Sequence, residues 1–359
     1  MMKKAWSTAL IAGASTVALA TVAATADAAT KANNLPTHNV SVAMAKKEGM
    51  VHGFGMPANW ANLGNMWASF QKKYGIKTVY QAEGNMSSAQ ELQAFAKEKN
   101  HPIGDVGDIG ISFGPGAVQM GVLAPYKNKY WNQIPANLKN KNGYWAAAYY
   151  GVIAFEVNAK KVKQIPTTWQ DLLKPEYKGL IGMGDPRQAG ESFDAVVAAA
   201  VANGGSVNNL QPGINFFAKL KKSGNWNGSN VGTSEMQTGQ NAIQIVWNYL
   251  GESDQKQLKS EDIKVIVPKD GTVAGPYVEV INKYAPHPYA ARLLNEYLFS
   301  NAGQISYAEG GAYPVRLKHI KLPKGVHLPP LPKKVTFLTG DLSKQQNLVN
   351  NAWQSQVLG

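Results

Sequence analysis

The chain has 359 residues, 44% of them hydrophobic, a formal net charge of +13 and no cysteine. This length suffices for two domains with their own cores, and the lack of cysteine excludes disulfides, a thiol nucleophile and a lipid-modified cysteine anchor. The positive charge favours anionic partners, but the lysines are scattered and no run of five like charges occurs, so we expect no nucleic-acid surface.

The N-terminus has the pattern of a secretory signal peptide. Two lysines precede an apolar stretch from Ala9 to Ala20, and Ala26-Asp27-Ala28 is typical of a cleavage site. The apolar stretch is too short to span a bilayer. We therefore predict a signal peptide at residues 1–28 and a periplasmic location for the remaining 331 residues (359 − 28).

From about residue 40, short apolar strands alternate with amphipathic helices, which indicates an α/β fold. In the first part we predict, in chain order, a strand at Met50–Phe54, a helix with Trp60, Leu63, Trp67, Phe70 and Tyr74 on its apolar face, a strand at Lys77–Gln81, a helix begun by a Ser88/Glu91 capping box, and a strand at Gly104–Ile111.

The second part begins with a β-rich run at Trp145–Asn158, which is long enough to pass from one lobe to another. The further predicted elements are a helix from the threonines of PTTWQDLL (166–173), a strand at 179–186, a helix at 191–205, strands at 241–249, 263–268 and 275–288, a helix at 290–300, and an irregular crossing at 322–334.

Catalytic signatures are missing from the sequence. It has no H-E-x-x-H, G-x-S-x-G or P-loop motif, and its six histidines stand singly without metal-ligand spacing. The stretch GFGMPA (Gly53–Ala58) imitates a dinucleotide-binding turn, but Pro57 interrupts it and the next strand does not end in the expected acid. We expect no catalytic residue, no metal site and no cofactor.

The segment HPYAARLLNEYLFSNAGQISYAEGGAYPVR (His287–Arg316) resembles part of the bacterial extracellular solute-binding proteins, the periplasmic receptors of ABC importers. Four other stretches agree in the expected order: Gly53–Trp60, YYGVIAFEVN, 166–179 and the GDP at Gly184. The resemblance covers nearly the whole chain after the leader. It is closest to the group that contains ferric-ion, polyamine, thiamine, phosphonate and sugar-phosphate receptors.

This resemblance implies the type II periplasmic-binding-protein fold, in which two α/β lobes joined by hinge strands close on a small solute. It places residues 37–147 plus 271–300 in lobe 1 and residues 148–270 plus 301–359 in lobe 2. The implied partner is an ABC permease at the inner membrane, and we expect a monomer without catalysis. Two other functions remain open: an exported hydrolase or transferase on an α/β scaffold, and a sensor that uses the same closing lobes.

Ten residues are candidates for solute contact because they lie at expected strand ends, helix starts or the lobe crossing: Asn59, Trp60, Ser87, Ser88, Asp108, Tyr150, Arg187, Ser192, Trp247 and Tyr249. Arg187 is one of only three arginines, and its planar guanidinium can hold a phosphate or carboxylate with two hydrogen bonds. Alternation along the crossing strand predicts that Tyr150 faces the solute and Tyr149 points away. Helix capping, core packing and surface charge are the structural alternatives for these positions.

The ligand class follows from how this chain departs from the group. Ferric receptors of the group typically carry two adjacent tyrosines where this chain has Trp-Asn-Tyr-Leu (247–250), so only Tyr249 is present. Polyamine receptors use several carboxylates, and this chain has 23 acids against 36 basic residues. We therefore predict a small anion that carries a phosphate, phosphonate or carboxylate, with a ferric-ion or polyamine/thiamine-type ligand as the alternative.

Overall fold

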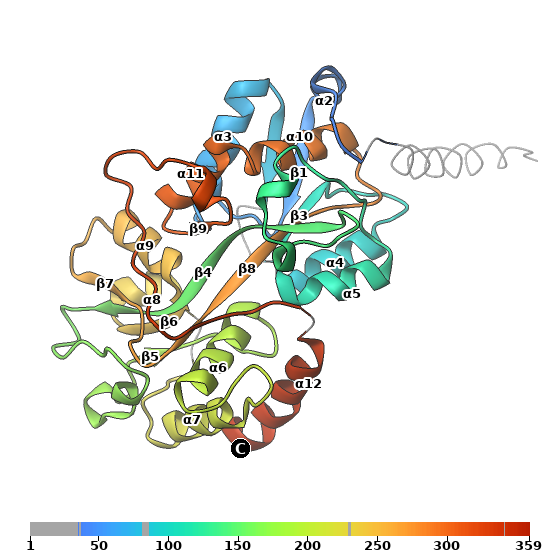
Figure 1. The fold of residues 1–359 in the computed structure, drawn as a ribbon. Helices are drawn as coiled ribbons and strands as arrows, with labels where there is room; N and C mark the ends of the chain where they lie inside the picture. The colour runs from blue at the N-terminus through green and yellow to red at the C-terminus, as the bar shows by residue number, and fades with distance from the viewer. Residues whose placement is uncertain (1–34, 36, 81–85, 229–230, 341) are drawn as a thin grey trace, which may run out of the picture.

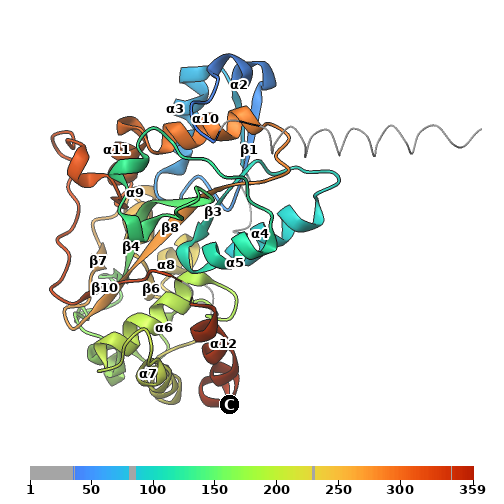
Figure 2. The same cartoon turned by 45° about the vertical axis from the view of Figure 1, so that its right-hand side comes forward.

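The computed structural model describes residues 35, 37–80, 86–228, 231–340 and 342–359; the predicted signal peptide at 1–28 lies outside them. Strands and helices gather into two parts, and two long strands, β4 and β8, run side by side between them in both views (Figures 1 and 2). Figure 2 shows α6, α7 and α12 together in the lower part.

The strands are β1 (Met50–Phe54), β2 (Lys77–Tyr80), β3 (Val106–Gly110), β4 (Trp145–Asn158), β5 (Ile181–Gly182), β6 (Ile243–Trp247), β7 (Ile263–Ile266), β8 (Thr272–Ile281), β9 (Tyr313–Pro314) and β10 (Val335–Phe337). The helices are α2 (Val42–Glu48), α3 (Leu63–Tyr74), α4 (Ser88–Lys97), α5 (Gly114–Met120), α6 (Gly190–Ala202), α7 (Gln211–Lys222), α8 (Thr233–Thr238), α9 (Asn248–Gln257), α10 (Pro288–Leu298), α11 (Asn301–Glu309) and α12 (Ser343–Ala352). None of these described helices is both long and apolar enough to cross a membrane.

The sheet order β2-β1-β3-β8-β4-β6-β5 places β4 and β8 at the centre of the molecule. On one side β1 pairs in parallel with β2 and β3, and on the other side β5 pairs in parallel with β6. β8 and β4 join the two sets through antiparallel pairing. Each part therefore has its own short parallel sheet, and the two central strands belong to both.

The 14-residue β4 changes partners along its length, and this divides the fold in two. Its first half, Trp145 to Val152, pairs with β8, and its second half, Ile153 to Val157, pairs with β6. The predicted run Trp145–Asn158 is confirmed as one strand with the same bounds. Because no turn interrupts it, the two parts are held by continuous backbone, as hinge strands require.

The helix α11 packs against elements that belong to the predicted lobe 1. It contacts α3 and α10, and the Asn62 side-chain amide donates to the Ser306 carbonyl oxygen (2.9 Å) and hydroxyl (2.8 Å). These contacts favour a lobe boundary after α11 rather than at residue 300. The full division into lobes 37–147 plus 271–300 and 148–270 plus 301–359 stays a prediction.

Three local predictions are wrong. Trp60 lies before α3 rather than on it, because the helix begins only at Leu63. The helix expected from the threonines of PTTWQDLL is a 3-10 turn, Gln170–Leu173, and Pro175 prevents it from continuing. Tyr249 lies in the first turn of α9, since the strand before it stops at Trp247.

Packing between α6 and α7 depends on a glycine at a close helix contact. A Cβ at Gly213 would overlap the carbonyl oxygen of Val196 and lie 2.8 Å from the amide nitrogen of Ala200. Both neighbours are backbone atoms of α6, which cannot swing aside like a side chain. The small residue therefore sets how closely the two helices approach.

We predict that Gly213→Ala lowers the free energy of unfolding by about 1–3 kcal/mol, because overpacking against backbone outweighs the better helix propensity of alanine. Gly116→Ala in α5 is the matched control, since its Cβ would meet nothing within 4 Å. The control should be neutral or slightly stabilising. Urea denaturation of both variants checks this, and equal stabilities would contradict the packing argument.

Candidate functional site

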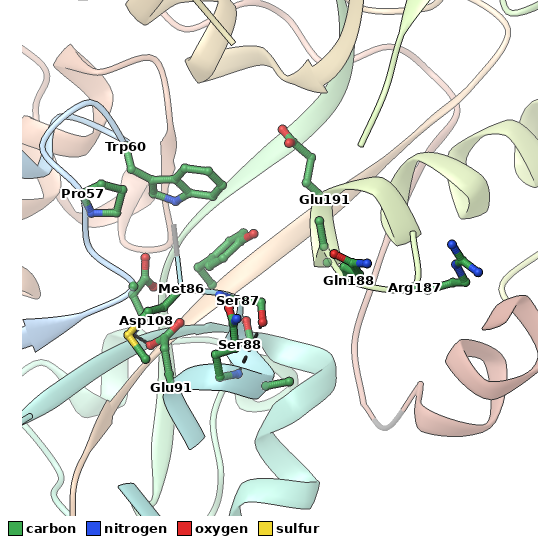
Figure 3. A pocket seen from close by; sticks show the side chains of 16 residues that line it. Pro57, Trp60, Met86, Ser87, Ser88, Glu91, Asp108, Arg187, Gln188 and Glu191 are labelled. Carbon is green, nitrogen blue, oxygen red and sulfur yellow. Dashed lines mark hydrogen bonds between the residues drawn. The ribbon is translucent and has the colours of Figure 1, made fainter. Parts of the chain in front are cut away.

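A cleft of about 560 Å³ lies where the two parts meet. Its lining comes from the predicted lobe 1 through Gly55, Pro57, Trp60, residues 86–91, Asp108 and Tyr277, and from the predicted lobe 2 through residues 187–191. Figure 3 shows Trp60, Ser87, Ser88 and Asp108 on one side of the opening, with Gln188 and Glu191 at the start of α6 on the other. The structure thus brings five predicted residues to one cleft: Trp60, Ser87, Ser88, Asp108 and Arg187.

The start of α4 forms one wall of this cleft. Ser87 is the cap: its hydroxyl accepts from the Gln90 amide (3.4 Å), while the Gln90 side chain accepts from the Ser87 amide (2.8 Å). The capping box is therefore one residue earlier than the predicted Ser88/Glu91 pair, because Ser88 is already helical and its hydroxyl accepts from the amide of Gly110 (3.0 Å). The first amides of α4 open toward the cleft without intrahelical acceptors.

The start of α6 forms the opposite wall. Its cap, Ala189, has no side-chain oxygen, so the helix has no side-chain cap. The first turn begins with Gly190, Glu191 and Ser192, whose amides have no intrahelical acceptor, because the first such bond runs from the Phe193 amide to the Ala189 carbonyl oxygen (3.0 Å). Two helix starts therefore present backbone N–H groups to one cleft, and the helix dipoles add positive potential there.

The floor on the lobe 1 side is acidic and buried. Asp108, Glu91 and Glu279 are at most 3% exposed, and the amide of Asp108 donates to Glu91 Oε2 (3.0 Å). Burial raises the pKa of all three carboxyls, and their mutual repulsion raises the pKa of Asp108 and Glu91 further. Three acids so close together cannot all ionise, so this floor carries less negative charge than its composition indicates.

Tyr149 links this floor to the aromatic side of the cleft. Its hydroxyl donates to Asp108 Oδ2 (2.6 Å) and accepts from the Trp60 indole nitrogen (2.7 Å). The Trp60 ring packs edge-on against Tyr277 and Tyr249, each at 5.5 Å between centroids. Tyr149 therefore fixes the orientation of a cleft tryptophan through a hydrogen-bond chain that ends on the buried Asp108.

Glu191 is the acid of the α6 wall. It is 9% exposed, and its Oε1 accepts from the backbone amide of Trp247 (2.6 Å). Burial raises the pKa of Glu191 to about 7, and the hydrogen bond from Trp247 opposes this shift. This carboxyl is therefore able to gain or lose its proton near neutral pH.

Arg187 lies at the rim of the cleft with its guanidinium already engaged. Its Nε and NH2 donate to the two carboxylate oxygens of Asp185 (2.9 and 2.6 Å), and its NH1 donates to Gln354 of the C-terminal π-helical segment Trp353–Leu358 (2.8 Å). Burial would raise the pKa of Asp185, but the hydrogen bonds from Arg187 outweigh it and lower the pKa. Figure 3 shows Arg187 set apart from the other labelled side chains.

The prediction for Tyr150 had the wrong face of the strand. Its ring stacks on Tyr313 at 5.0 Å, away from the cleft lining, whereas Tyr149 points inward to Asp108. The β4–β8 register shifts between Ala147 and Tyr149, and such an irregularity breaks simple alternation. A single sequence does not reveal this shift.

Four other predicted residues do not line the cleft. Asn59 is exposed in the turn before α3. Ser192, Trp247 and Tyr249 are at most 2% exposed, and Trp247 and Tyr249 stack on each other behind Trp60 and Tyr277. They shape the cleft by packing rather than by direct exposure to it.

Residues that sequence reasoning missed include Glu91, Gln188, Tyr149 and Tyr277. Local pattern does not indicate the Tyr149 and Tyr277 pair, because the two rings are brought opposite each other by the β4–β8 register, in which they stack at 5.6 Å. The sequence predicts Glu91 only as a capping residue, and it gives no sign that a charged residue is buried here. Within the described residues, no group of three or more His, Asp or Glu side chains is arranged to hold a metal ion.

Comparisons with known proteins place the chain among binding proteins. Residues 102–344 match the family model described as "Bacterial extracellular solute-binding protein". An "Uncharacterized protein" of Haemophilus influenzae is 32% identical over 139 residues, 36% of this chain and 39% of the relative. A "Putative 2-aminoethylphosphonate-binding periplasmic protein" of Salmonella typhimurium is 24% identical over 246 residues, 67% of this chain and 70% of the relative.

Solved structures share the fold. The periplasmic binding protein AfuA from Actinobacillus pleuropneumoniae, with fructose-6-phosphate bound, aligns with a TM-score of 0.69 and 21% identity over 86% of this chain and 98% of that one. A ferric binding protein from Campylobacter jejuni aligns with a TM-score of 0.63 and 19% identity over 85% and 97%. These alignments confirm the predicted two-lobed α/β architecture of type II periplasmic binding proteins.

The buried acids make stability depend on pH in a direction that can be tested. Burial raises the pKa of Glu279 to about 8, against about 4.3 for an unfolded glutamate. A raised pKa means that the stability contribution is fully present below about pH 4.3 and is lost as the pH rises through about 8.

We predict that Glu279→Gln, which imitates the protonated acid and still accepts from Tyr307, becomes more stable relative to the unchanged protein as the pH rises from 5 to 9. Melting temperatures across this range measure the difference. A difference that stays constant with pH would contradict the assignment of a buried, proton-bearing carboxyl.

Proposed function

The chain belongs to the bacterial extracellular solute-binding proteins, and from this premise we propose that it captures a small anionic solute in the periplasm and delivers it to an ABC permease. The solute carries a phosphate, phosphonate or carboxylate group. The protein itself performs no catalysis in this proposal.

The observation that carries the proposal is the pair of helix starts that open on one cleft from opposite sides. The first turns of α4 and α6 both line the space of about 560 Å³, and α6 has no side-chain cap to occupy its amides. An oxyanion placed between them accepts hydrogen bonds from both predicted lobes. Such a ligand stabilises the closed arrangement more than an open one, which is the requirement for a population shift.

The hinge strands support this mechanism. β4 and β8 pass between the parts without a break, so a small twist of the pair moves the α4 and α6 walls relative to each other. The Ser88 hydroxyl, which accepts from Gly110, still has its own proton to donate to an oxyanion. In the proposal, closure therefore adds amide and hydroxyl donors from two lobes to one ligand group.

The names of related proteins support an oxyanion that contains phosphorus. The Salmonella relative is named for an aminophosphonate, and the Actinobacillus structure holds a sugar phosphate. Other structural relatives are named for ferric ion and polyamines, so these remain the alternative ligands. We propose the phosphorus oxyanion because the first turns of α4 and α6 present backbone N–H groups and the Ser88 hydroxyl to the cleft.

Arg187 has an indirect part in this proposal. Its bidentate pairing with Asp185 holds the turn that leads into α6, and its contact with Gln354 ties this turn to the C-terminal segment. The predicted direct contact between Arg187 and an anion remains a prediction, because it requires the guanidinium to exchange a bond that Asp185 now accepts.

A thermal-shift screen tests the ligand class. Phosphate esters, phosphonates, carboxylates, spermidine, thiamine and ferric citrate are compared, since a bound solute stabilises the native state by mass action. The proposal expects concentration-dependent stabilisation by a phosphate ester or phosphonate. Stabilisation by ferric citrate or spermidine alone would overturn it, and measurable turnover of an ester or phosphoester would favour the hydrolase alternative.

We predict that Gly190→Pro weakens oxyanion binding roughly 10- to 100-fold, the scale of one hydrogen bond to a charged group. Proline suits the first helical position and removes only the N–H, and Ala189 already has the extended backbone (φ −115°, ψ 127°) that precedes proline. Isothermal titration calorimetry with the solute found in the screen measures the loss.

Gly190→Ala is the matched control for this variant. It keeps the N–H, and its Cβ would meet only a Phe113 ring carbon at 4.0 Å, so it should bind like the unchanged protein. Equal affinities for the proline and alanine variants would show that the α6 amide makes no ligand contact.

A further inference from the structure

The charged side chains that line the cleft are mostly acids. Among the lining residues that the structure describes, Arg187 is the one cation, and Asp185 accepts two of its N–H groups. Glu91, Asp108 and Glu191 are the lining carboxyls. A solute with only negative charge would be drawn to the helix starts and repelled by any of these acids that is ionised.

The three acids differ in their freedom to ionise. Glu91 and Asp108 lie beside Glu279 in one buried group, where each negative charge opposes the others. Glu191 stands on the opposite wall, and burial alone raises its pKa, to about 7. Of the three, Glu191 therefore becomes a carboxylate most readily, and a nearby cation would hold it in that form.

Glu191 also has a free oxygen at the cleft. Its Oε1 accepts from the Trp247 amide, and among the described residues no hydrogen bond is recorded for Oε2, although the side chain is 91% buried (9% exposed). Figure 3 shows the Glu191 carboxylate directed away from the start of α6, on the Trp60 side of the helix. The Glu191 carboxylate therefore has one oxygen that can still accept a hydrogen bond from a ligand.

Aromatic rings supply the second feature of a cation site. Trp60 and Tyr277 both line the cleft, and their centroids lie 5.5 Å apart. Burial raises the pKa of Tyr277, and the nearby Glu191 carboxyl raises it further. Ring faces beside a carboxylate attract ammonium groups through their quadrupole.

We propose that the solute is a zwitterion whose ammonium group pairs with Glu191 beside Trp60 and Tyr277 while its phosphonate or phosphate group accepts from the starts of α4 and α6. This inference rests on the proposed capture of a phosphorus oxyanion and adds the positive end of the ligand. It explains why an acid occupies the first turn of the helix that binds the anion: the ammonium neutralises it.

Calorimetric titration of the purified protein with 2-aminoethylphosphonate and with ethylphosphonate tests this inference. The two compounds share the phosphonate and differ only in the amine. We expect the amine to raise affinity roughly tenfold or more, the scale of one charged hydrogen bond. Equal affinities would overturn the zwitterion assignment and leave anion capture standing. No binding of either phosphonate would overturn this inference, and the thermal-shift screen with phosphate esters and carboxylates decides separately whether anion capture fails.

The Glu191→Gln variant tests whether Glu191 is the residue that pairs with the ammonium group. The amide keeps an oxygen that can accept from Trp247 and loses the charge, so the ratio of the two affinities should fall close to one while ethylphosphonate binds at least as well as before. Glu261→Gln, which removes the same charge from an exposed position, should leave the ratio unchanged. A Glu191→Gln protein that keeps the full preference for the amine would contradict the role of Glu191.

Discussion

The antiparallel pairing of β4 with β8 is the constraint on which the arrangement depends. These two strands belong to both halves of the fold, and each short parallel sheet is attached along one end of the pair. Helices that follow strands in such sheets begin at the same edge, and here the starts of α4 and α6 are brought to face each other across one cleft. The strand order therefore places the N–H donors of both helix starts at the cleft.

The acids buried near the cleft carry less negative charge than their number indicates. Burial and mutual repulsion raise the pKa values of the acids below Trp60, while Tyr149 donates to Asp108 and orients Trp60. The net charge of the chain is +13, yet Arg187, the one cation among the described lining residues, is paired with Asp185, so the net charge does not describe the binding site. The groups at the cleft, the N–H donors of two helix starts and the Glu191 carboxyl, determine what it attracts.

Much of the architecture was predictable from the sequence because it depends on residues close in the chain. β1 and β4 have the predicted bounds, and Ser87, Ser88 and Asp108 were found by their position at helix starts and strand ends. What failed depends on distant partners. The register of β4 with β8 decides which face of β4 points inward. The guanidinium of Arg187 is already hydrogen-bonded to Asp185 and to Gln354, which lies 167 positions later. Local pattern cannot report such pairings.

The central claim is that an oxyanion bridges the first turns of α4 and α6. Amide chemical shifts measured by NMR during titration with a phosphonate test this contact most directly. The account predicts that the largest shifts fall on the amides of Ser88, Ala89, Gly190 and Glu191, from both helices and with one shared affinity. Shifts confined to one helix, or centred on residues away from this cleft, would contradict it.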